Sequence, residues 1–139
     1  MAVITEQIQL NTSGDTDIID ITDRVAGYLR SNKVKNGVVT VFVPGSTAGL
    51  TTIEYEPGLI KDLKRLFEEI APKKKEYNHN LRWQDGNGYS HVRAALLGPS
   101  LTVPFKNKEL HLGTWQQIVL IDFDNRPRSR RVIVQIIGE

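Results

Sequence analysis

The chain has no cysteine, no long apolar run and little excess charge of either sign. Without cysteine, it has no disulfide and no thiolate metal site, so a bound metal would need imidazole and oxygen ligands. No apolar run approaches the roughly 18 residues of a membrane-spanning helix, and the N-terminus lacks the features of a signal peptide. We therefore expect a cytoplasmic protein without a membrane partner. The 18 basic and 16 acidic residues leave a net charge of +2, which is too small to predict nucleic-acid binding.

The residues that are present have the composition of an ordinary globular domain. The 139 residues are 40% hydrophobic and 24% charged, which suits one domain with a workable core. Residues 1–139 show no internal repeat, no low-complexity segment and no linker. We therefore expect a single domain.

Patterns of apolar residues predict a domain with both helices and strands. Alternating or continuous apolar residues predict strands at residues 3–10, 18–21, 38–43, 50–55, 101–103, 110–112, 118–123 and 132–137. Helical spacing and cap signals predict helices at residues 22–32, 57–70 and 91–97. The expected fold class is α+β, a mixed or antiparallel sheet sandwich with about three helices.

The segment from His79 to His91 holds the densest group of candidate site residues. It contains two of the three histidines, with Asp85 midway between them. The glycines after Asp85 disfavour regular structure, so we expect an irregular loop that ends at a short helix with Ser90 as its N-cap. His91 would then lie in the first helical turn, where N–H groups and the helix dipole attract anions. His79, Asp85 and His91 are also candidate ligands for a divalent metal such as Mg²⁺ or Zn²⁺.

Each of these groups also has a structural interpretation. The two histidines could be ordinary hydrogen-bonding residues, since their spacing matches no established metal signature. Asp85 and Asn87 could be oxygen ligands, or simply turn residues that precede glycine. His111 alternates with leucines in an expected strand, so we interpret it as structural.

Two further segments contain groups suited to phosphate. Ser46 and Thr47 lie in a glycine-flanked turn after an apolar strand. Such a turn can offer N–H and hydroxyl groups to a phosphate, or it can simply connect strands, and it is no Walker motif. Between positions 126 and 131, four arginines that include Arg128 form either a solvated hairpin or a phosphate contact.

Several short motifs, in order along nearly the whole chain, are similar to those of a known family. The chain resembles the YjbQ-like proteins, uncharacterised-protein family 0047, which are also named secondary thiamine-phosphate synthase. The matching residues are Val41-Phe42-Val43-Pro44, Thr47-Ala48, Glu54, Asn87, Ser90-His91, Ala95-Leu96-Leu97-Gly98-Pro99-Ser100, Leu112-Gly113-Thr114-Trp115-Gln116 and the C-terminal segment from Arg131 to Glu139.

The resemblance implies a mixed α/β fold, a homotrimer formed by sheet packing, and a pocket near the protomer boundary. It also implies an enzyme that joins a pyrimidine-methyl diphosphate to a thiazole phosphate and releases pyrophosphate. In this scheme His91, Glu54 and Asp85 would shuttle a proton or hold a metal. Ser46, Thr47 and arginines such as Arg128 would bind phosphate oxygens of the phosphorylated ligand.

Other residues and functions stay open at this point. Asn87 and Gln116 are candidate ligand contacts, and the Gln116 amide could hydrogen-bond a heterocycle, while Trp115 suits the core or a subunit interface better than a stacking role. Many family members carry His-Thr-Thr-Ala after the proline, whereas Gly45 replaces that histidine here. Two alternative functions are a metal-assisted hydrolase and a non-catalytic trimeric protein that binds phosphate or metal.

Overall fold

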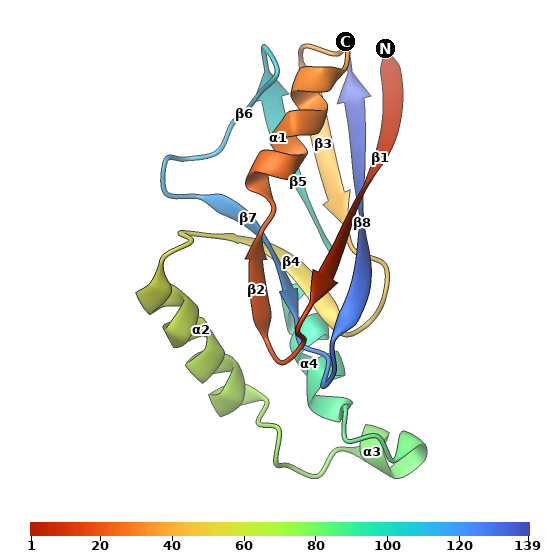
Figure 1. Cartoon of the computed structure of the whole chain (residues 1–139), viewed down its shortest axis with the longest axis vertical. Coiled ribbons are helices and arrows are strands. Elements are labelled where there is room, and N and C mark those ends of the chain that lie inside the picture. The colour runs from red at the N-terminus through yellow and green to blue at the C-terminus, as the bar shows by residue number, and fades with distance from the viewer.

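The computed structural model describes all 139 residues and has an α+β fold (Figure 1). Eight strands form two antiparallel sheets, of order β1-β8-β3-β5-β6 and β2-β7-β4. The elements are β1 (Ala2–Thr12), β2 (Asp17–Asp20), α1 (Thr22–Ser31), β3 (Gly37–Phe42), β4 (Ala48–Ile53), α2 (Pro57–Ile70), α3 (Asn78–Trp83), α4 (Gly88–Leu97), β5 (Ser100–Lys106), β6 (Glu109–Leu110), β7 (Gln117–Asp122) and β8 (Arg128–Gly138). The predicted fold class is confirmed, with four helices in place of about three.

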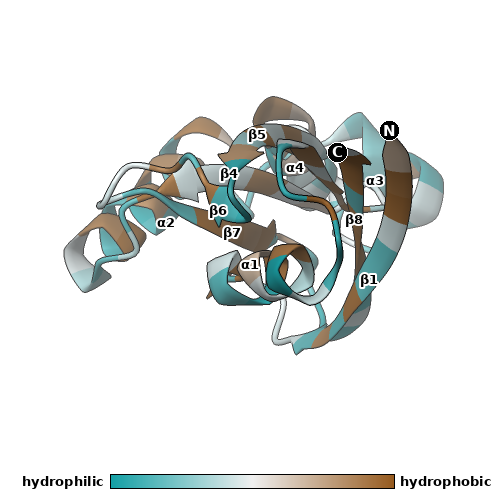
Figure 2. Ribbon diagram, turned by 90° about the horizontal axis from the view of Figure 1, so that it is seen from above, coloured by the Kyte–Doolittle hydropathy of each residue, from teal (hydrophilic) through white to brown (hydrophobic).

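The three-stranded sheet is buried on both faces. Ile118 and Leu120 of β7 pack into a large core that the five-stranded sheet and α1 complete. The alternate residues Val119 and Ile121 pack with Phe67 of α2 and residues of α4 in a second core. Figure 2 shows the resulting concentration of apolar residues in β7. A strand that is apolar on both sides is expected where a sheet lies between two layers.

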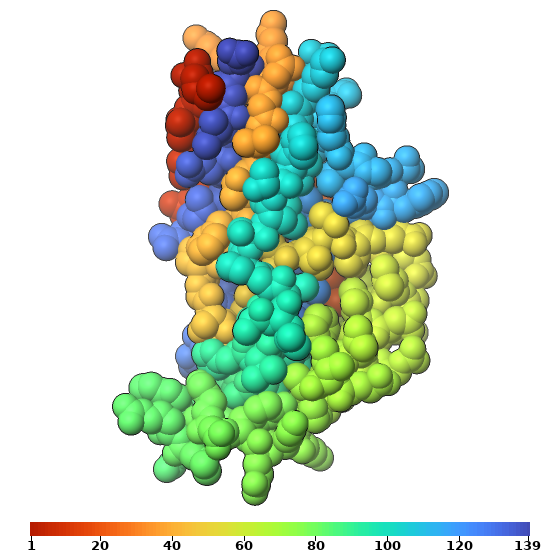
Figure 3. All heavy atoms as spheres, turned by 180° about the vertical axis from the view of Figure 1, so that it is seen from behind, coloured from red at the N-terminus to blue at the C-terminus, as the bar shows by residue number.

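The five-stranded sheet has one face that no helix covers. In Figure 3, β1, β8, β3 and β5 lie side by side on this face. Strand register and alternation place the following uncharged side chains on it, which we call the outer sheet face: Val3, Thr5, Gln7, Ile133, Gln135, Ile137, Val38, Thr40, Phe42, Ser100, Thr102 and Pro104. The opposite side of these strands faces the large core.

The prediction of an irregular loop beginning at residue 79 is wrong for its first residues, because α3 occupies Asn78–Trp83. The chain ends this helix at Gln84 in the left-handed conformation (φ 54°) before it reaches the two glycines. The helix α4 has Asn87 rather than Ser90 at its N-cap. Ser90 is fully buried and its hydroxyl donates to the Phe123 carbonyl oxygen (2.7 Å), so it fastens α4 to the end of β7.

Three strand boundaries also differ from the prediction. Strand β4 ends at Ile53, which leaves Glu54 exposed beyond it. Strand β6 stops at Leu110, so His111 is exposed outside the strand. Strand β8 begins at Arg128, and its first inward-facing arginines, Arg128 and Arg130, pair with the buried Asp124 and Asp122. No helix in the structure is both long and apolar enough to cross a lipid bilayer.

Candidate functional site

The structure brings His79 and His91 into contact. His79 lies on α3 and His91 lies in the first turn of α4, and their ring centroids are 4.2 Å apart with a 36° tilt. The close approach of the two helices depends on Gly88, because a Cβ at that position would lie 2.6 Å from Tyr77 Cβ and 3.0 Å from Asn80 Oδ1. Glycine at position 88 therefore allows the two imidazoles to touch.

Asp85 lies beside the histidine pair. Its Oδ1 is 3.8 Å from His79 Nδ1, and it accepts a hydrogen bond from the Asn87 backbone N–H (3.1 Å). His79 Nδ1 is buried and has no hydrogen-bond partner. Asp85 therefore has the turn role that its sequence suggested, and His79 Nδ1 is left without a hydrogen-bond partner.

The environment of His91 favours its neutral form. Burial lowers the pKa of His91 below its ordinary value, and the neighbouring His79 lowers this pKa further. Asp85 and Asp124 act in the opposite direction on the same pKa, without reversing the shift. A neutral imidazole can accept a proton, which a general base requires.

Sequence analysis missed two aspartates at the end of β7. Asp122 and Asp124 flank Phe123 and are fully buried. Asp122 accepts hydrogen bonds from Thr12 Oγ1 (2.6 Å), Arg130 Nε (2.7 Å) and Arg130 Nη2 (2.9 Å). The available signal was the Asp-Phe-Asp motif directly after a buried strand, since carboxylates there need cationic partners.

Asp124 connects this buried pair to the predicted site residues. Its Oδ2 lies 2.9 Å from Arg128 Nη2 and accepts hydrogen bonds from Thr47 Oγ1 (2.9 Å) and Asn87 Nδ2 (3.4 Å). Burial alone raises the pKa of Asp124, but Arg128 and the hydrogen-bond donors outweigh burial, so this pKa lies below its ordinary value. The second oxygen, Oδ1, is buried without a partner. Asp124 is therefore an ionised carboxylate with one free acceptor.

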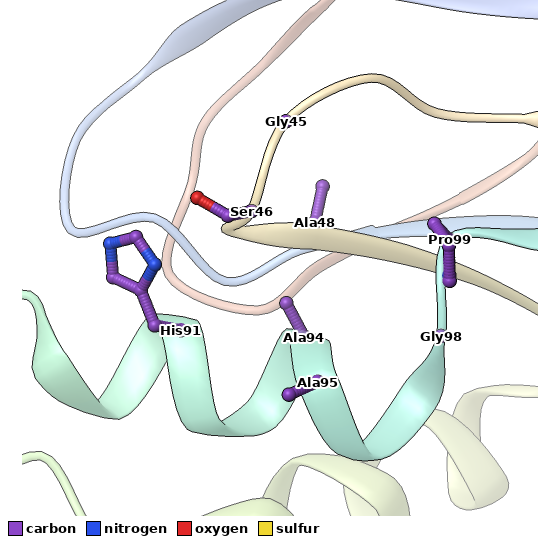
Figure 4. Close-up of a pocket in the computed structure, with 8 residues that line it drawn as sticks. All are labelled: Gly45, Ser46, Ala48, His91, Ala94, Ala95, Gly98 and Pro99. Atoms are coloured by element: carbon purple, nitrogen blue, oxygen red, sulfur yellow. The ribbon is translucent and has the colours of Figure 1, made fainter.

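A cavity of about 370 Å³ lies between the β3–β4 loop and α4 (Figure 4). Gly45, Ser46 and Ala48 line one side, and His91 with two alanines of α4 lines the other. Figure 4 shows the Ser46 hydroxyl directed toward the side where the His91 ring lies. The small side chains that line the cavity keep it open, and its polar side chains, Ser46 and His91, lie at one end of it.

Thr47 and Asn87 do not line this cavity. Both are buried, and Thr47 Oγ1 lies between Asp124 and Arg130, from which it accepts a hydrogen bond (2.7 Å). Asn87 Oδ1 accepts from the Asn125 backbone N–H (3.2 Å). These two residues position the aspartate and arginine groups.

Glu54 and Gln116 lie apart from this group. Glu54 follows the opposite end of β4 from Thr47, at about 3.4 Å per strand residue. Gln116 lines a separate hollow of about 270 Å³ with His111, and its Nε2 donates to Thr52 Oγ1 (3.1 Å). Trp115 is 74% exposed, so a core position for it is wrong, and its interface role stays a prediction.

The predicted metal ligands fit an ion only in part. His79 Nδ1 has no hydrogen-bond partner and lies beside Asp85, and the His91 ring is adjacent. No three His, Asp or Glu side chains in the structure are arranged to hold an ion together. A metal at this site would therefore need a change of side-chain rotamers or further ligands.

Comparison with known proteins identifies the family of the chain. The family model described as UPF0047 protein YjbQ-like matches residues 6–139. The chain belongs to the YjbQ-like UPF0047 family. A UPF0047 protein from Methanothermobacter thermautotrophicus is 40% identical over 139 residues, which cover 100% of this chain and 95% of the relative. The UPF0047 protein YugU from Bacillus subtilis is 34% identical over 133 residues, covering 94% and 97% of the two chains.

Solved structures of YjbQ-like proteins share the fold. A YbjQ-like protein of unknown function from Sulfolobus solfataricus has a TM-score of 0.94 at 33% identity and matches 99% of each chain. A protein of the YjbQ/UPF0047 family from Clostridium acetobutylicum has a TM-score of 0.86 at 35% identity, with 95% of this chain and 99% of that chain covered. These likenesses confirm the predicted family and the α+β fold.

Proposed function

We propose that this YjbQ-like protein is a small enzyme that acts on a phosphorylated small molecule bound in the cavity beside His91. The observation that carries the proposal is the pairing of a neutral imidazole with a hydroxyl at one end of the cavity. His91 and Ser46 both line it, and the pKa of His91 is lowered by burial. Asp124 lies close enough to His91 to act on its pKa and pairs with Arg128, so the Arg128 guanidinium would supply a donor for phosphoryl oxygens near the proton acceptor.

The leading reaction is a condensation of the thiamine-phosphate type. A thiazole nitrogen would attack the methylene carbon of a pyrimidine-methyl diphosphate, the new C–N bond would replace the C–O bond, and pyrophosphate would leave with the bonding electrons. The chain would align the two substrates and stabilise the leaving group through donors near Ser46. This bond exchange needs no proton transfer, and the neutral His91 would donate a hydrogen bond from its ring N–H to the departing pyrophosphate.

Ligand binding and turnover test the proposal in sequence. Saturating pyrophosphate should raise the melting temperature by mass action. Pyrophosphate release from the two substrates should then be lost in His91→Ala and retained in His111→Ala, since His111 lies at a separate hollow. Absence of both a thermal shift and turnover would contradict the proposal. A thermal shift without turnover would favour a non-catalytic phosphate-binding protein.

Metal-assisted hydrolysis is a second candidate, favoured by the free His79 Nδ1 beside Asp85. A divalent ion such as Zn²⁺ or Mg²⁺ would activate a water molecule there, and His79, Asp85 and His91 would hold the ion. Metal analysis of the purified protein tests this candidate. Stoichiometric metal that His79→Ala removes would support it, and a metal-free protein that still turns over would contradict it.

The proposed assembly is a homotrimer, and the proposed compartment is the cytoplasm. The outer sheet face supports assembly, because a broad, mostly uncharged surface with Val38 and Phe42 exposed is unusual on an isolated protomer. Cell fractionation tests the compartment, and a membrane-bound or exported protein would contradict it.

A further inference from the structure

Arg130 is rigidly held, yet one of its nitrogens is free. Its Nε and Nη2 donate to Asp122 at 2.7 and 2.9 Å, and Nη2 also donates to Thr47 Oγ1 at 2.7 Å. Nη1 has no hydrogen-bond partner in the protein. The buried side-chain atoms without a partner are His79 Nδ1, Asp124 Oδ1 and Arg128 Nε. Arg130 Nη1 is not among them, and the Arg130 side chain is 10% exposed, so this nitrogen is not sealed inside the core.

Gly45 leaves open the space beside this nitrogen. It lines the cavity with Ser46 and has a φ of 113°, a conformation that favours glycine. A Cβ built on Gly45 would lie 3.1 Å from Arg130 Nη1 and would meet no other non-neighbouring atom within 4 Å. The free guanidinium nitrogen is therefore the one close boundary of an otherwise open space at the cavity wall.

We infer that Arg130 Nη1 binds a phosphoryl oxygen of the substrate in the space that Gly45 leaves open, beside the Ser46 hydroxyl. This inference rests on the proposed function and names the side chain that recognises the phosphorylated end of the ligand. Asp122 fixes the guanidinium plane, so Nη1 is oriented before the ligand arrives and loses little rotamer freedom on binding. Gly45 is then a specificity-determining residue, since any side chain there would cover the donor.

Because the charges around Arg130 nearly cancel, a phosphate would be held there mainly by hydrogen bonds and only weakly by net electrostatic attraction. Arg130 is paired with Asp122 and Arg128 is paired with Asp124, so the cluster is close to neutral. Binding of phosphate oxygens should therefore depend on the geometry of Nη1, and it should weaken only modestly with added salt.

Two glycine variants test the contact directly. Gly86 does not line the cavity and has a positive φ of 66°, and a Cβ there would meet nothing within 4 Å. Gly86→Ala therefore carries the same kind of backbone strain as Gly45→Ala without covering Arg130 Nη1. By calorimetry with inorganic pyrophosphate, Gly45→Ala should weaken binding about tenfold, the effect of about 1.4 kcal/mol, and Gly86→Ala should stay within about twofold.

The outcomes separate this inference from the proposed function. If the wild-type protein binds no pyrophosphate, the proposed function fails and this inference fails with it. If the wild type binds and both variants bind equally well, the Arg130 contact is overturned while the proposed function stands. Nitrogen-15 NMR of the wild-type side chains gives a second test that needs no folded variant. Pyrophosphate should shift the Arg130 Nη1 resonance, and an unmoved resonance at saturation overturns the contact.

Discussion

The Arg130 guanidinium donates hydrogen bonds to both oxygens of the Asp122 carboxylate. Arg130 Nε lies 2.7 Å from Oδ2 and Nη2 lies 2.9 Å from Oδ1, and Asp122 is fully buried. This bidentate pair joins the end of β7 to the start of β8. The pair therefore holds Thr47, Asp124 and the adjoining cavity wall in position.

Acid should destabilise the protein through His91. Burial and His79 lower the pKa of His91 in the folded state below its ordinary value of 6.5, so the unfolded chain takes up this proton first as pH falls. The His91 contribution to stability is therefore present above pH 6.5 and is lost below it. Urea unfolding at a series of pH values from about 8 to about 5 should show this loss. The slope should flatten in His91→Gln and persist in His111→Gln, and an unchanged slope in His91→Gln would contradict the assignment.

Removing Arg128 should perturb Asp124. Arg128→Gln deletes an ion pair to a buried carboxylate, so we expect the pKa of Asp124 to rise and the free energy of unfolding to fall by about 2 kcal/mol. Carbon-13 NMR titration of the carboxyl groups and urea unfolding measure the two effects. Arg126→Gln is the matched control, because Arg126 is exposed in the adjoining turn. Equal effects in both variants would show that the pair is unimportant.

Light scattering should give three times the protomer mass of 15.7 kDa if the homotrimer forms. A lysine at the centre of the outer sheet face should break the assembly, because a charge would be buried without a partner. Thr40→Lys is suited to this test, since Thr40 lies between Gln135 and Thr102 in the sheet. Ser31→Lys at the exposed end of α1 should leave the mass unchanged. A wild-type monomer at micromolar concentration would contradict the trimer.

Arg93 should be the most sensitive arginine for folding. Its side chain is 2% exposed and donates to the Ala71 carbonyl oxygen (2.9 Å), Thr16 Oγ1 (2.9 Å) and Glu68 (2.8 Å). Arg93→Ala should lower the free energy of unfolding by about 3 kcal/mol in urea, since it leaves buried acceptors unpaired. Arg65→Ala removes only exposed ion pairs and should cost about 0.5 kcal/mol or less. Similar losses in the two variants would refute a structural role for Arg93.

Local patterns were sufficient for most elements but not for the polar base of the site. The continuous apolar run before Asp122 predicted β7, and helical spacing after Pro57 predicted α2, because both signals depend only on neighbouring residues. The buried hydrogen bonds of Asp122 and Asp124 join residues 110 and 77 positions apart in sequence. A single sequence contains no measure of such long-range pairing, so Asp122 was predicted only as part of the strand at residues 118–123, and Asp124 only as part of the turn that follows.

The same limit explains the separate positions of the candidate site residues. His79 and His91 were grouped because they are close in sequence, but the helix α3 that brings their rings into contact was not predicted. Glu54 was linked to them only by resemblance, and a strand separates it from Thr47. Glu54 therefore lies apart from the other candidates, because an extended strand carries its two ends far apart.

The close approach of Tyr77 to the Gly88 backbone has a consequence for related sequences. No Cβ fits at position 88 while α3 and α4 keep their present separation, because it would lie 2.6 Å from Tyr77 Cβ. A related sequence with alanine or a larger residue at the equivalent position must hold these helices farther apart, and its two imidazoles cannot stack as they do here. One residue of a relative's sequence therefore indicates whether its two imidazoles can lie in contact.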